Sequence, residues 1–133
     1  MRLRTPRPST PPPACIPDRH IFGAIDATTG KVAWEIRVPQ PAKSGLVVAG
    51  DLVFFGESNG RFHAVDAATG RMLWTFAGTS IRHGGGANAA PIAYMVNGRE
   101  FIANAFGGNE DDRDIEGSPL GDAIVAFALP THG

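Results

Sequence analysis

The 133-residue sequence has a single cysteine, Cys15, and this scarcity excludes two kinds of site. One thiol allows no disulfide within the chain and no metal site built from several cysteines. The sequence also lacks Cys-x-x-Cys-His, the motif that attaches c-type haem. Cys15 lies among prolines with no folded scaffold around it, so we expect a free thiol rather than a catalytic one.

Long apolar runs and an excess of one charge are missing too. No stretch of about 18 apolar residues occurs, so the sequence predicts no transmembrane segment. The formal net charge is -1, whereas a general nucleic-acid binder carries a basic excess, so we expect no nucleic-acid partner. The basic N-terminal residues include no apolar core of a secretory signal, so no signal peptide is expected in this chain.

The first 20 residues differ in composition from the rest. They hold six of the eleven prolines and four arginines. Proline lacks a backbone donor and is disfavoured in helix interiors and central strands. We therefore expect a disordered or polyproline-like arm over residues 1–20, a folded region over 21–130 and a short tail over 131–133. A stretch outside the native reading frame is the other interpretation of the arm.

The sequence does contain an internal repeat. Residues 22–36 align with residues 62–76 at an offset of 40 without a gap, and seven of the fifteen aligned positions are identical. A period near 40 is typical of propeller blades and of some helical repeats. Each copy holds a turn sequence, Asp-Ala-Thr-Thr-Gly or Asp-Ala-Ala-Thr-Gly, between short β-rich runs. No segment of about 11 residues has helical periodicity, which favours strands.

The β-rich runs predict an all-β fold. Residues 45–76 contain four successive strands, which make one complete propeller blade. The other expected strands cover residues 23–26, 32–36, 91–96, 100–106 and 122–129. We therefore expect a partial β-propeller of about two and a half four-stranded antiparallel blades.

Asp26 and Asp66 occupy the same position of the two copies. We expect each carboxylate to cap amides of its own turn, because two repeat equivalents are not an acid and base pair. The tryptophan of each copy, Trp34 or Trp74, is expected to close its strand against the next sheet.

The repeat resembles the tryptophan-docking motif of the PQQ-dependent (quinoprotein) dehydrogenases, which reads roughly Ala-x-Asp-x-x-Thr-Gly-Lys-x-x-Trp. The motif stands at residues 24–34 and again at 64–74, where Arg71 replaces the lysine. The closing segment 121–130 is similar to the C-terminal part of the alcohol or glucose and quinate types. The resemblance covers residues 21–130.

This resemblance implies a propeller that holds PQQ on its axis, with a Ca²⁺ or lanthanide ion polarising the quinone and a carboxylate accepting a proton from an alcohol or sugar. The catalytic aspartate and most metal ligands of the family lie in earlier blades, so no catalytic or metal-binding residue is expected here. We expect a periplasmic C-terminal portion, inactive alone, that pairs with the remaining blades or with itself through open strand edges. A non-enzymatic propeller-repeat protein that binds a partner or acts in assembly is the alternative, and an independent β-domain is a third.

Within this resemblance, the starts of the innermost strands are the places that would meet the cofactor. We predict Lys43, Ser44 and Asn88 as PQQ-binding residues. Many alcohol-oxidising relatives have a Trp-Asn-Gly-Gly type sequence at the first of these places, and the Lys43-Ser44 sequence departs from it. Ordinary loop residues at a propeller face are the other interpretation.

Three polar features are expected to have no site role. His83 precedes three glycines and is expected to be a loop residue, and His63 replaces Gly23 of the first copy and is expected on a strand surface. The acidic run between residues 107 and 121 lacks the spacing of a Ca²⁺ loop, so we expect a solvated loop there.

Overall fold

The computed structural model describes residues 20–108 and 119–128, which form three antiparallel sheets and one short 3-10 turn, η1 (Gly78–Ser80). Residues 1–19 of the predicted arm, most of the acidic run and the tail lie outside the described residues. The first sheet contains β1 (His20–Ile25) and β2 (Val32–Val38). The second contains β3 (Leu46–Ala49), β4 (Leu52–Gly56), β5 (Arg61–Asp66) and β6 (Met72–Ala77). The third contains β7 (Ile92–Val96), β8 (Arg99–Phe106) and β9 (Ala123–Ala128).

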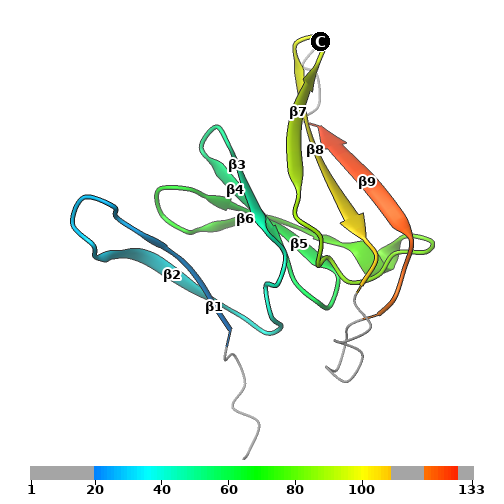
Figure 1. The fold of residues 1–133 in the computed structure, drawn as a ribbon, viewed down its shortest axis with the longest axis horizontal. Helices are drawn as coiled ribbons and strands as arrows, with labels where there is room; N and C mark the ends of the chain where they lie inside the picture. Colours follow the sequence, from blue (N-terminus) through cyan, green and yellow to red (C-terminus); the bar gives the residue numbers. More distant parts are fainter. Residues whose placement is uncertain (1–19, 109–118, 129–133) are drawn as a thin grey trace, which may run out of the picture.

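The three sheets follow one another in chain order, and each packs a face on the next (Figure 1). Within each sheet, strands that follow one another in sequence pair with each other, as in a propeller blade. The prediction of a partial β-propeller of about two and a half blades is confirmed, and the three sheets contain two, four and three strands. β1 begins at His20, one residue before the predicted boundary, because His20 pairs with Val38 of β2. No helix in the described ranges has the length and apolarity needed to cross a bilayer.

The two repeat turns are held by their aspartates, as predicted. The Asp26 carboxylate accepts the amides of Thr28 at 2.8 Å and Thr29 at 2.9 Å. These bonds stabilise the charged form, so the amide of Thr29, and next that of Thr28, holds the pKa of Asp26 below its usual 3.8. Asp26 is therefore a structural turn residue.

Asp66 is held in the same way by the other copy of the turn. Its carboxylate accepts the Thr69 amide at 2.8 Å, the Thr69 hydroxyl at 2.9 Å and the Ala68 amide at 3.0 Å. The Thr69 hydroxyl and amide lower the pKa of Asp66.

An aromatic layer joins the first sheet to the second. Phe22 of β1 stacks on Phe55 of β4 with ring centroids 3.9 Å apart. Trp34 of β2 donates its indole N–H to the Ala67 carbonyl at 2.9 Å, across the sheet interface. Its ring covers Gly70, where an added Cβ would lie 2.5 Å from the indole. The second turn thus needs glycine both for its φ of 71° and for the tryptophan above it.

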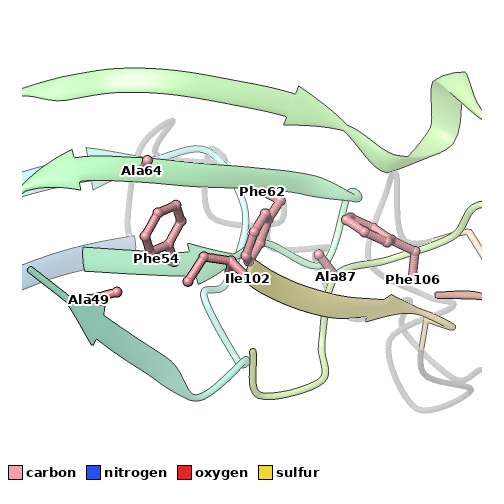
Figure 2. Packing of buried hydrophobic residues seen from close by; sticks show 7 residues of the cluster. All are labelled: Ala49, Phe54, Phe62, Ala64, Ala87, Ile102 and Phe106. Atoms are coloured by element: carbon pink, nitrogen blue, oxygen red, sulfur yellow. The ribbon is translucent and has the colours of Figure 1, made fainter. Parts of the chain in front are cut away.

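A second core lies between the second and third sheets. Figure 2 shows Phe54 and Phe62 of the second sheet beside Ile102 of β8, with Phe106 at the end of the same cluster. Phe62 has no exposed surface. Trp74 also lies here, edge to face with Phe127 at 5.1 Å between ring centroids. Each face of the second sheet therefore packs against a neighbouring sheet, with the buried residues concentrated on β4 and β5.

Candidate functional site

The candidate site consists of two segments that reach the same end of the second sheet. One is the linker of residues 39–45 that leads into β3, and the other is the segment of residues 83–88 before β7. Both contact the end of β4: the Gly56 amide donates to the Ser44 hydroxyl at 2.7 Å, and the Ala87 amide donates to the Glu57 carbonyl at 3.0 Å. The structure therefore brings the segments that carry the predicted residues together.

Ser44 is fixed by the backbone around it. Besides accepting the Gly56 amide, its hydroxyl lies 2.7 Å from the Gly45 carbonyl and 3.1 Å from the Gly56 carbonyl. A serine hydroxyl has one proton, so one of these carbonyls takes it and a ligand can only use the remaining lone pair. Ser44 serves first to pin the start of β3 to the end of β4.

Lys43 and Asn88 lie beside these anchored residues. Lys43, next to Ser44, is exposed, and Asn88, next to the fully buried Ala87, is half-buried. A side chain on Gly56 would overlap the Ala87 carbonyl, so the close approach of this segment to β4 requires glycine. Lys43 can supply a positive charge and Asn88 an amide to a ligand at this end of the sheet.

Two glycines, Gly85 and Gly86, fix the backbone path of the second segment. Gly85 donates its amide to the Phe106 carbonyl at 2.9 Å, and Gly86 donates to Pro119 at 2.8 Å. An added Cβ on Gly86 would lie 2.5 Å from the Ser58 carbonyl. This backbone-to-backbone packing fixes where Asn88 emerges from the fold.

His83 is a loop residue, as expected. Its ring nitrogen Nδ1 lies 3.7 Å from the Asp122 carboxylate, and both side chains are exposed. An exposed ion pair of this length contributes little to stability. Among the described residues, no group of three or more histidine, cysteine, aspartate or glutamate side chains could hold a metal ion.

The prediction for His63 was wrong. It is buried, with 4% of its surface exposed, and it stands between two polar partners. Its Nε2 lies 2.6 Å from Oε1 of Glu57, and its Nδ1 lies 2.9 Å from the Thr75 hydroxyl. Gly23, the equivalent of His63 in the first copy, lies on the exposed face of the first sheet. The equivalent face of the second sheet packs against the first sheet, so His63 is buried there.

Glu57 was not recognised from the sequence. Its carboxylate is 1% exposed and accepts the Gln40 backbone amide at 3.0 Å in addition to its contact with His63. The signal was the alternation of β4 and β5: Val53, Phe55 and Val65 form one apolar face, and His63 falls in the same phase. A histidine in that phase indicates a buried polar partner nearby.

Comparison with known proteins identifies the family. The family model PQQ_2, described as outer membrane protein assembly factor BamB, matches residues 18–123. Quinoprotein alcohol dehydrogenase PedE of Pseudomonas putida is 39% identical over 93 residues, which are 68% of this chain and 14% of that protein.

Solved structures of alcohol-oxidising quinoproteins share the fold. The quinohemoprotein alcohol dehydrogenase of Comamonas testosteroni superposes with a TM-score of 0.66 and 31% identity, covering 85% of this chain and 18% of that one. A europium-containing methanol dehydrogenase superposes with a TM-score of 0.66 and 28% identity, covering 82% of this chain and 23% of that one. The chain thus spans less than a quarter of these relatives, and it belongs to the PQQ-dependent (quinoprotein) dehydrogenase family.

Proposed function

We propose that this chain forms the C-terminal blades of a PQQ-dependent dehydrogenase that oxidises alcohols or sugars by hydride transfer to PQQ, and that it is inactive without the remaining blades. The observation that carries the proposal is its likeness to quinoprotein alcohol and methanol dehydrogenases over 18–23% of their length. The described residues form a scaffold with one candidate ligand-binding end and no group of metal-binding side chains.

The linker of residues 39–45 and the segment of residues 83–88 are the parts of this chain that would face the cofactor. PQQ supplies the hydride acceptor, and a Ca²⁺ or lanthanide ion beside it acts as a Lewis acid. PQQ is an anionic quinone with several carboxylates, so the exposed Lys43 ammonium and the Asn88 amide suit it chemically. Ser44 suits it less, because its proton is already donated to the backbone. We assign the metal ligands to the other blades.

The outer face of the first sheet is the proposed contact with a preceding blade. Ile21 and Ile25 of β1 are 57% and 69% exposed there, whereas Val65, the equivalent of Ile25 in the second sheet, has no exposed surface. Gly30 corresponds to Gly70, yet nothing lies within 4 Å of an added Cβ on Gly30. We propose that a preceding blade covers this face and places an aromatic side chain over Gly30, as Trp34 covers Gly70.

A chimera tests the proposed function. Residues 21–130 replace the matching segment of the Pseudomonas putida alcohol dehydrogenase, and PQQ-dependent alcohol oxidation is measured. We expect the chimera to bind PQQ and oxidise alcohol, because the grafted blades complete the ring and the relative supplies the catalytic residues. A folded, monodisperse chimera that binds no PQQ would contradict the proposal.

That negative outcome would favour the alternative, a non-enzymatic PQQ-like propeller that acts in partner binding or assembly. We also propose a periplasmic location, which the family resemblance suggests. Fractionation of the native organism tests it, and recovery only in the cytoplasm would contradict it.

A further inference from the structure

A buried carboxylate lies at the turn between β4 and β5, outside any role assigned so far. Glu57 is 1% exposed and its neighbour Ser58 is fully buried. Burying a carboxylate is costly unless hydrogen bonds replace its water. In the first copy of the repeat, Gly23 and Glu35 stand in place of His63 and Thr75, so that copy lacks the histidine of the Glu57–His63 pair. The blade fold therefore does not require the pair, and its presence calls for a local role.

Both oxygens of Glu57 have defined partners. Oε1 lies 2.6 Å from His63 Nε2, and Oε2 accepts the Gln40 amide at 3.0 Å and lies 3.5 Å from the Asn59 side-chain amide. An ionised Glu57 carboxylate can accept from both groups when His63 Nε2 carries the proton, and Oε2 can accept the Gln40 N–H in either protonation state. The Thr75 hydroxyl, 2.9 Å from Nδ1, completes the imidazole's hydrogen bonds.

Three hydrogen bonds join this turn and the end of β4 to the linker that leads into β3. Glu57 holds the Gln40 amide, the Ser58 amide donates to the Pro41 carbonyl at 3.1 Å, and the Gly56 amide donates to the Ser44 hydroxyl at 2.7 Å. The β4–β5 turn therefore grips the linker at three successive points. Lys43 lies between the second and third of them.

We propose that Glu57 and His63 are positioning residues that fix the linker of residues 39–45 against the second sheet, and so set where Lys43 and Ser44 meet the cofactor. His63 orients the Glu57 carboxylate, and the carboxylate holds the Gln40 amide. The cofactor part of this inference rests on the proposed function; the grip on the linker does not.

Hydrogen exchange of the full chain, read at single amides, tests the grip. In the wild-type chain we expect the Gln40 amide to exchange at least about tenfold more slowly than the Thr29 amide, because its acceptor is buried whereas Asp26 is exposed. Equal exchange rates at the two amides would overturn the proposal without any substitution.

Three variants separate a local grip from general stability. Glu57→Met keeps the shape but removes both acceptors, and should speed Gln40 exchange about tenfold while leaving Thr29 unchanged. Glu57→Gln should stay within about twofold of wild type, because its oxygen can accept Gln40 and its amide can donate to the other tautomer of His63. Thr75→Val, the matched control, leaves the Glu57 contacts intact and should leave Gln40 protected. Equal acceleration at Gln40 and Thr29 in Glu57→Met would contradict a local grip.

The same substitutions in the chimera test the cofactor part. We expect Glu57→Met to weaken PQQ binding about tenfold and Glu57→Gln to restore it. Unchanged binding in Glu57→Met would overturn the positioning role. Failure of the unsubstituted chimera to bind PQQ would instead overturn the proposed function, while the exchange result still decides the grip.

Discussion

The first and second sheets contain two copies of one repeat in different surroundings. In β1 the residues alternate between half-buried and exposed, whereas four successive residues of β5, 62–65, are buried. The sequences of the two copies are similar, so the difference in burial comes from their neighbours. Within residues 20–108 and 119–128, the second sheet packs against a sheet on each face, whereas the first sheet packs against one sheet on a single face. Each copy therefore carries docking surfaces that an adjacent blade buries.

Truncation of the equivalent phenylalanines, Phe62 and Phe22, should give the largest difference in stability between the two copies. Phe62→Ala removes a fully buried ring that contacts Phe54, Phe106 and Phe127, and should cost about 3–5 kcal/mol of unfolding free energy. Phe22→Ala removes the half-buried equivalent and should cost less than half as much. Urea unfolding of the two variants checks this, and an equal or larger loss for Phe22→Ala would contradict it.

Alanine at the equivalent turn glycines should give the next largest difference. Both residues have positive φ, 69° at Gly30 and 71° at Gly70, so each substitution costs about 1 kcal/mol in backbone strain. Gly70→Ala also drives a methyl group into Trp34, which should add about 1–3 kcal/mol. Thermal unfolding of both variants measures the gap; identical losses would mean that Trp34 does not cover Gly70 in solution.

Replacement of each tryptophan by phenylalanine should give a smaller difference in stability between the two copies. Trp34→Phe removes the indole N–H that donates to the Ala67 carbonyl, which should lower the unfolding free energy by about 1–2 kcal/mol. Trp74→Phe keeps an aromatic ring against Phe127 and should cost less. Denaturant midpoints compare the two, and a larger loss in Trp74→Phe would refute this ordering.

The smallest expected effect is the acid sensitivity of the two turns. The folded-state pKa of Asp26 and of Asp66 lies below the unfolded value of 3.8. Each therefore contributes stability that is fully present above pH 3.8 and is lost as the pH falls through its lower folded pKa. Asp26→Asn and Asp66→Asn should each flatten the decline of the unfolding midpoint between about pH 4 and 2. An unchanged pH profile in both variants would contradict this.

The sequence predicted the features that depend on local chemistry. The turn sequences at Asp26 and Asp66 predicted two of the hairpins, and the β-rich runs between them predicted the strand order. The burial of His63 could not be read from its copy, because it depends on a sheet whose packing face is specified by Phe22 and Trp34, far away in the chain. The role of Glu57 could not be predicted either, because its partner Gln40 belongs to a linker whose sequence has no periodicity. The predicted roles of Lys43, Ser44 and Asn88 stay predictions.

Thermal unfolding of the chain and of the chimera, with and without PQQ and Ca²⁺, tests whether the cofactor site needs the remaining blades. A ligand that binds only the folded state raises the melting temperature. We predict a clear rise for the chimera and none for the chain alone, because the site needs residues from the other blades. A rise of the same size in the chain alone would show that the site lies within these sheets, and no rise in a folded chimera would contradict a quinoprotein function.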